Sequence, residues 1–285
     1  MIFMSTGGLR NVTAAEAAMH FFRQGILGVE LSSGAFSATY EADLMALPSE
    51  LTLQLHNYFP PPAISFVLNL ASTDLAIAEQ SVQLVRTAIR LAVLLRRPVY
   101  SFHAGFRLNP RVGDLGKTLG RYDLVDREIA LDQFEKRVVM LAEEARREGV
   151  TLLIENNVIT MASLANYGED PLLLTHPDEI SSFMAKMPSN VGLLLDVAHL
   201  KVSARTHGFD LLQAHAKVEK WIKGYHLSDN DATSDSNEYV TSNSWFWEVL
   251  IPGLDYYSLE IYNATTASLV EQCRFLAAKL AVRSA

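Results

Sequence analysis

Metal-ligating side chains recur at the ends of six short, mostly apolar segments of the sequence. Each segment has the composition of a buried strand, and a histidine or an acid stands at its end. The six residues are His56, His103, Glu155, Asp196, His226 and Glu260. A buried acid without a partner is costly, and a metal ion is one such partner. The recurrence therefore predicts a shared metal site.

The ligand types narrow the choice of metal. Imidazoles and carboxylates without thiolates suit Zn, Mn, Co, Fe or Ni, and the only cysteine is Cys273. We expect a divalent metal cofactor, Zn, Mn, Co or Mg. The first predicted site comprises Glu155, Asp196, His226 and Glu260. A second site would comprise His56, His103 and the shared Glu155.

Each ligand also has a structural alternative. Asp196 could cap the helix that follows it, which would leave His199 on that helix and facing solvent. For His56, His103 and His226, the alternative is a core histidine bonded to a backbone carbonyl. The recurrence of the pattern at six strand ends favours the metal site over these separate explanations.

Strand and helix patterns alternate eight times. The strands are expected at 2–6, 29–31, 51–57, 98–103, 150–155, 191–196, 223–226 and 256–260, and the helix after the sixth strand at about 210–220. Such alternation in 285 residues predicts a single (β/α)8 TIM barrel that spans residues 1–285. The carboxyl ends of its strands would meet at one mouth, where active sites of this fold lie. An open doubly wound sheet is the alternative, but the segment 6–10 is not a glycine-rich phosphate fingerprint.

Composition excludes several classes of protein. The net charge of −8 argues against broad, sequence-independent binding to nucleic acid. We see no signal peptide, and the apolar stretches are too short or too interrupted to span a bilayer. We therefore expect a cytoplasmic protein with a small-molecule partner, and the sequence leaves assembly into a homo-oligomer open.

Together the strand-end motifs resemble those of the xylose isomerase-like TIM barrel superfamily. This group includes sugar and sugar-phosphate isomerases and epimerases, and the endonuclease IV family (AP endonuclease family 2). The motifs are Leu55-His56-Asn57-Tyr58, Phe102-His103-Ala-Gly105, Ile154-Glu155-Asn156, Asp196-x-x-His199, His226-Leu-Ser-Asp229 and Leu259-Glu260. Single motifs are weak, but six in the right order are specific, and the resemblance covers nearly the whole chain.

The resemblance to the epimerases implies proton transfer next to a carbonyl of a sugar or sugar phosphate, through a metal-stabilised enediolate. Glu155 and Glu260 would face opposite sides of the sugar, so that one removes the proton and the other returns it. His199 would hydrogen-bond a substrate oxygen or orient a ligand. If both glutamates are only ligands, isomerisation or dehydration would replace epimerisation.

The endonuclease-type phosphodiesterase is the alternative activity. The three-metal endonucleases carry an Asp-x-His pair in the loop after strand seven, where the nearest equivalent here is Asn237-Glu238-Tyr239. Neither Asn237 nor Tyr239 is a good metal ligand, so the third metal would be lost and His199 freed. A barrel that binds a ligand without turnover is a third hypothesis, but two symmetric carboxylates argue against it.

Residues for substrate contact are predicted from their position near the mouth. Glu30, at the end of the second strand, would hydrogen-bond the substrate. Aromatic candidates for stacking on a sugar face, with core packing as the alternative, are Tyr58, Phe59, Trp245 and Trp247. Basic candidates for binding a phosphate or carboxylate, with a solvated loop as the alternative, are Arg107, Arg111, Lys117 and Arg121.

Overall fold

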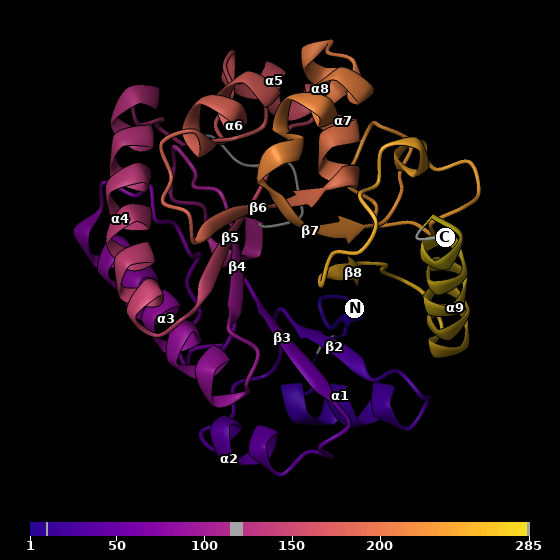
Figure 1. The fold of residues 1–285 in the computed structure, drawn as a ribbon. Coiled ribbons are helices and arrows are strands. Elements are labelled where there is room, and N and C mark those ends of the chain that lie inside the picture. The colour runs from indigo at the N-terminus through magenta and orange to yellow at the C-terminus, as the bar shows by residue number, and fades with distance from the viewer. Residues whose placement is uncertain (10, 115–121, 284–285) are drawn as a thin grey trace.

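A closed parallel barrel forms the centre of the protein, as the strand–helix alternation predicts (Figure 1). The structure is a computed structural model and describes residues 1–9, 11–114 and 122–283; Lys117 and Arg121 lie outside these residues. Neighbouring strands pair in chain order, and β8 closes the barrel against β1. The strands are β1 (Ile2–Ser5), β2 (Gly28–Leu31), β3 (Thr52–His56), β4 (Val99–His103), β5 (Thr151–Glu155), β6 (Val191–Asp196), β7 (Ile222–Leu227) and β8 (Tyr257–Leu259).

Helices surround the barrel (Figure 1). The α-helices are α1 (Ala14–Phe22), α2 (Tyr40–Met45), α3 (Leu75–Leu94), α4 (Arg127–Arg147), α5 (Met161–Tyr167), α6 (Pro177–Met184), α7 (Val197–His207), α8 (Leu211–Val218) and α9 (Thr266–Arg283). The 3-10 helices are η1 (Val112–Asp114), η2 (Glu219–Trp221) and η3 (Trp245–Glu248). Among the described residues, no helix is long and apolar enough to cross a membrane.

The helix after the sixth strand differs from the prediction. We expected it at about 210–220, where α8 lies, but α7 comes first and begins directly after Asp196. Most of α7 is buried, from Val197 to Leu200 and from Val202 to Ala204. A helix that is buried on most sides shows no apolar stripe at helical spacing, which is the signal that marks a surface helix in a sequence.

Alternation of side chains along the strands places the polar residues inside the barrel. Four buried apolar side chains form a cluster in its interior, namely Phe3, Leu153, Leu194 and Tyr256. Residues two apart on a strand point to the same face. Glu155 and Asp196 each follow one of these interior residues by two positions, so both project into the barrel at its carboxyl end. The larger apolar core lies between the strands and the helices.

Gly28 allows β1 and β2 to approach closely, because a Cβ atom there would lie 2.1 Å from the backbone oxygen of Ile2. We expect Gly28→Ala to lower the free energy of unfolding by at least ~1–3 kcal/mol, the usual cost of overpacking, since a backbone oxygen cannot rotate away. Gly113→Ala is the control, because a Cβ there meets nothing within 4 Å. Guanidinium denaturation measures both variants, and equal stability would contradict the close packing described.

Candidate metal centre at the barrel mouth

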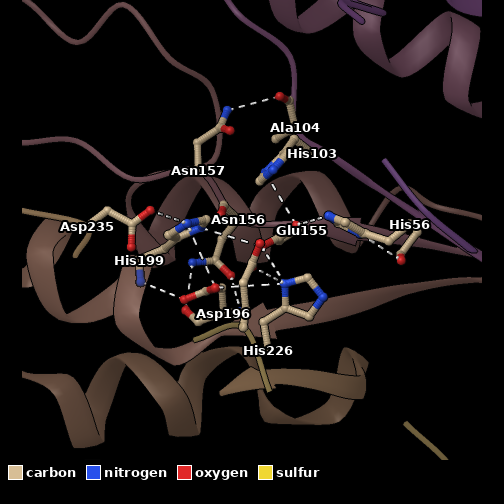
Figure 2. Close-up of polar contacts among 12 residues, drawn as sticks. His56, His103, Ala104, Glu155, Asn156, Asn157, Asp196, His199, His226 and Asp235 are labelled. Carbon is tan, nitrogen blue, oxygen red and sulfur yellow. Dashed lines mark hydrogen bonds and ion pairs between the residues drawn. The ribbon is translucent and has the colours of Figure 1, made fainter. Parts of the chain in front are cut away.

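The strand-end residues converge around Glu155 (Figure 2). One of its oxygens, Oε2, lies 3.2 Å from His56 Nε2 and 3.4 Å from His103 Nδ1. The other, Oε1, lies 3.1 Å from His226 Nδ1. The same His226 nitrogen lies 2.9 Å from Glu260 Oε2, which comes from the far end of the chain. Residues from five separate segments, chosen for their place after apolar runs, therefore share one small volume.

This cluster offers donor atoms at distances suited to a cation. Each residue of three sets provides one potential ligand atom, and within a set these atoms lie within 4.8 Å of one another. The sets are His56–Glu155–His226, His103–Glu155–His199 and Glu155–Asp196–His226–Glu260. The last of these contains the four residues predicted as the first site, and we call it the four-residue centre.

Several donor atoms of the four-residue centre have no hydrogen-bond partner among the described residues. These buried atoms are both carboxylate oxygens of Glu155, Asp196 Oδ2 and His226 Nδ1. Buried polar atoms are rarely left without a partner. A divalent cation with nitrogen and oxygen ligands would satisfy all of them, so the residues present fit the predicted cofactor.

Burial and neighbouring charges act against each other in the cluster. Burial would raise the pKa of Glu155, but the surrounding histidines outweigh it and hold that pKa well below its usual range. Burial likewise opposes the charge on His226, yet Glu30, Glu155 and Glu260 raise its pKa well above the ordinary value. For His56 burial prevails and lowers the pKa to about 4. The metal-free cluster therefore holds an ionised Glu155 between a neutral His56 and a charged His226, and a cation bound at His226 would displace a proton.

Asp196 has two functions in the structure. Its Oδ1 accepts a hydrogen bond of 2.7 Å from the backbone N–H of His199 and caps α7. Its Oδ2 remains without a partner and lies 3.9 Å from His226 Nδ1. One oxygen of this carboxylate thus caps a helix, and the other is a potential metal ligand. The expectation that a capping Asp196 would leave His199 facing solvent is wrong, because His199 is only 5% exposed.

Both ring nitrogens of His199 have protein partners. Its Nδ1 lies 2.8 Å from the carbonyl oxygen of Asn156, and its Nε2 lies 3.2 Å from Asp235 Oδ2 (Figure 2). Asp235 lies in the loop after the seventh strand, two residues before the segment 237–239 that we compare with the Asp-x-His pair of the endonucleases. Tyr239 is 41% exposed.

Asn156 was not predicted as a site residue, although it directly follows Glu155 and contacts Asp196. Its side chain clamps the backbone of Asp196, donating to the carbonyl oxygen at 3.1 Å and accepting from the amide at 2.8 Å. Its own carbonyl faces His199. Its position directly after Glu155 was the signal present in the sequence. The sequence does not show that its side chain bonds the end of the neighbouring strand, β6.

Two of the predicted substrate-contact residues lie close to the centre. Glu30 is fully buried, and its Oε2 accepts hydrogen bonds from His226 Nε2 at 2.9 Å and from the Tyr256 hydroxyl at 2.6 Å. Trp245 donates from its indole nitrogen to the carbonyl oxygen of Val197, at the start of α7, at 3.2 Å. Trp245 therefore stands beside the end of β6, whereas Glu30 lies beneath the metal-ligand residues.

Four other predicted contact residues pack or bond within the protein. The hydroxyl of Tyr58 accepts a hydrogen bond of 2.6 Å from the backbone of Phe66 within its own loop. The guanidinium of Arg107 is buried and bonds Glu169 at 2.7 Å, as well as two backbone oxygens. Arg107 thus holds neighbouring loops together. Phe59 is fully buried in the core, and Trp247 packs against Phe275 of α9.

Comparison with known proteins agrees with the resemblance seen in the sequence. The family model described as "Xylose isomerase-like TIM barrel" matches residues 24–264, and the chain belongs to this family. A structure titled as a D-tagatose 3-epimerase-like protein is similar over 99% of this chain and 97% of its own, with 19% identity and a TM-score of 0.74. L-ribulose 3-epimerase is similar over 99% and 94%, with 17% identity and a TM-score of 0.70.

A third similar structure is the TTHB071 protein from Thermus thermophilus, in a crystal soaked with ZnCl2. It covers 96% of each chain with 20% identity and a TM-score of 0.63. The sequence matches no curated protein. At these identities the structures show a shared fold, and the chemistry has to be argued from the residues of this chain.

Substitution of Asp196 can separate its capping from its ligand-type function. Asparagine caps a helix as well as aspartate does, whereas alanine costs about 1 kcal/mol. Burial, followed by the charges of neighbouring acids, raises the pKa of Asp196 to about 7. Since its unfolded pKa is near 3.8, the metal-free protein loses stability as the pH rises between these two values. We therefore expect metal-free Asp196→Asn to be at least as stable as wild type above neutral pH.

Guanidinium denaturation at several pH values measures this difference. Asp196→Ala is the matched control, because it removes the buried charge and the cap together. An Asn variant that is less stable than the Ala variant would contradict the dual function of Asp196.

Proposed function

We propose that the protein is a divalent-metal-dependent isomerase or epimerase of a sugar or sugar phosphate. The reaction would move a proton on the carbon next to a carbonyl group. The observation that carries this proposal is the approach of two glutamates from non-adjacent strands to one imidazole nitrogen. Glu155 and Glu260 lie 3.1 Å and 2.9 Å from His226 Nδ1. A substrate held between them would have a carboxylate on each side.

The four-residue centre supports the metal dependence, through its unpartnered buried donors. When bound, a divalent cation would supply Lewis-acid stabilisation of the negative charge that develops on the substrate oxygens. The similar structures named as epimerases of tagatose and ribulose type support sugars as the substrate class.

The two glutamates have different surroundings, as a proton donor and a proton acceptor require. Glu260 Oε1 accepts a hydrogen bond from the hydroxyl of Tyr262, and a Cβ atom at Gly7 would lie only 2.5 Å from that hydroxyl. Glu155 is completely buried and faces imidazoles. In the proposed reaction one carboxylate takes the proton and the other returns it to the opposite face of the sugar.

His199 would orient the acids around the centre, because both of its ring nitrogens already face protein oxygens, those of Asn156 and Asp235. Its burial opposes a charge, but Asp196 and Asp235 outweigh it and raise the pKa of His199 well above its ordinary value. A charged imidazole beside the centre is a strong hydrogen-bond donor. Trp245 is our candidate for stacking on the sugar, whereas we assign Tyr58 and Arg107 to holding the loops that form the mouth.

The phosphodiesterase alternative has less support. The nearest equivalent of the endonuclease Asp-x-His pair is Asn237-Glu238-Tyr239, in which neither Asn237 nor Tyr239 is a good metal ligand. The net charge of −8 also disfavours a polyanionic substrate. Both observations favour isomerase or epimerase chemistry over phosphodiester cleavage.

Glu260→Gln tests the proposed proton transfer. The protein, loaded with Mn²⁺ or Co²⁺, is incubated with a panel of ketoses in D₂O, and mass spectrometry detects deuterium on the carbon next to the carbonyl. We expect exchange with at least one ketose, and a loss of at least ~10²-fold in its rate in the variant, because general acid–base catalysis contributes that much. Ketose binding should be largely retained.

The matched control is Glu248→Gln, which changes an exposed glutamate on η3. It should leave the exchange rate unchanged. A Glu260→Gln variant with the wild-type rate would remove Glu260 from the mechanism.

A further inference from the structure

A chain of hydrogen bonds runs beneath the mouth and joins two of the ligand-type histidines. It begins at His226 Nε2, which lies 2.9 Å from Glu30 Oε2, and the Tyr256 hydroxyl lies 2.6 Å from the same oxygen. That hydroxyl lies 3.0 Å from Ser101 Oγ, which lies 3.0 Å from His56 Nδ1. We call Glu30, Tyr256 and Ser101 the relay. Each of the three is at most 1% exposed.

The direction of each hydrogen bond in the relay follows from its first member. A carboxylate only accepts hydrogen bonds, so Tyr256 and His226 both donate to Glu30. The single hydrogen of the Tyr256 hydroxyl is then used. Its oxygen still lies 3.0 Å from Ser101 Oγ, and two oxygens at this distance need a hydrogen between them. Ser101 must therefore donate to Tyr256.

The last step assigns the proton on His56. Once the hydroxyl hydrogen of Ser101 is used, its oxygen can only accept from His56, so His56 Nδ1 carries a proton. The carbonyl oxygen of Leu55 also lies 3.3 Å from Ser101 Oγ. Donation to Leu55 would leave the oxygens of Tyr256 and Ser101 3.0 Å apart without a hydrogen between them, so we assign the hydrogen of Ser101 to its shorter contact with Tyr256.

The two histidines consequently offer different nitrogens to the same carboxylate. His56 presents the lone pair of Nε2, which lies 3.2 Å from Glu155 Oε2. His226, held by Glu30 at Nε2, leaves Nδ1 for a cation, and this atom lies 3.1 Å from Glu155 Oε1. These three residues form one of the sets of potential metal ligands.

We propose that Glu30 is a positioning residue that directs both histidines: it orients His226 by direct contact and fixes the tautomer of His56 through Tyr256 and Ser101. Gly224 of β7 makes room for this arrangement, because a Cβ atom there would lie 3.0 Å from three atoms of the Tyr256 side chain. The importance of the relay for metal binding rests on the proposed function, whereas the tautomer of His56 does not.

Long-range ¹H–¹⁵N correlation spectra of the histidine side chains test the proposal on the full-length, metal-free protein near neutral pH. His56→Gln identifies the signals of His56. We expect wild-type His56 to carry its proton on Nδ1. In Tyr256→Phe the Ser101 hydroxyl is free to donate to His56, and we expect the Nε2-protonated tautomer to appear. Ser101→Ala, which removes the oxygen that accepts from His56, should have the same effect and serves if Tyr256→Phe does not fold.

Tyr225→Phe is the matched control. Tyr225 is equally buried, but its hydroxyl bonds His215 at 2.8 Å, outside the relay. This variant should leave the signals of His56 unchanged. A wild-type His56 protonated on Nε2, or a His56 whose tautomer does not respond to either relay variant, would overturn the proposal.

Titration with Zn²⁺ against a competing chelator then separates the relay from the proposed function. If the relay orients metal ligands, Tyr256→Phe should bind Zn²⁺ about 10–100-fold more weakly than Tyr225→Phe, as is usual when a residue that orients a ligand is lost. If neither protein binds Zn²⁺ while His56 shows the expected tautomers, the positioning of His56 stands and the metal-dependent function fails.

Discussion

The burial of one charged carboxylate constrains the rest of this site. Glu155 is 0% exposed, and neither of its oxygens has a hydrogen-bond partner among the described residues, although imidazole groups lie nearby. An ionised carboxylate in such a place costs several kcal/mol unless opposite charges surround it. Histidines from three different strands approach it, and a cation would complete the neutralisation. The charge of Glu155 is therefore neutralised only when the whole barrel is assembled around it.

The barrel provides this assembly through the regular alternation of its strands. Apolar side chains close the interior, and the next inward position on several strands is polar. Asp196 then joins the site to the outer layer, since one of its oxygens caps α7 while the other faces the cluster. The relay continues these buried polar contacts beneath the mouth, from the ligand-type histidines to Glu30 and Tyr256. Some of the buried polar groups thus belong both to the fold and to the site.

Much of the site could be predicted because its signals are local. An apolar run followed by His103 or Glu155 is visible in the sequence, and a parallel barrel brings all such run ends to one mouth. Contacts between distant segments leave no such signal. Asp235 reaches His199 from an irregular loop, and Tyr256 meets Glu30 across 226 positions of sequence. Arg107 was predicted from its charge alone, which cannot show that its partner is Glu169.

The metal content of the purified protein tests the central claim most directly. The protein is prepared without chelator, analysed by elemental mass spectrometry, and then titrated with Zn²⁺, Mn²⁺, Co²⁺ and Mg²⁺. We expect at least one divalent cation per chain, and its loss in Glu155→Gln but not in Glu248→Gln. A protein that binds none of these ions, although it is folded, would contradict the proposed centre.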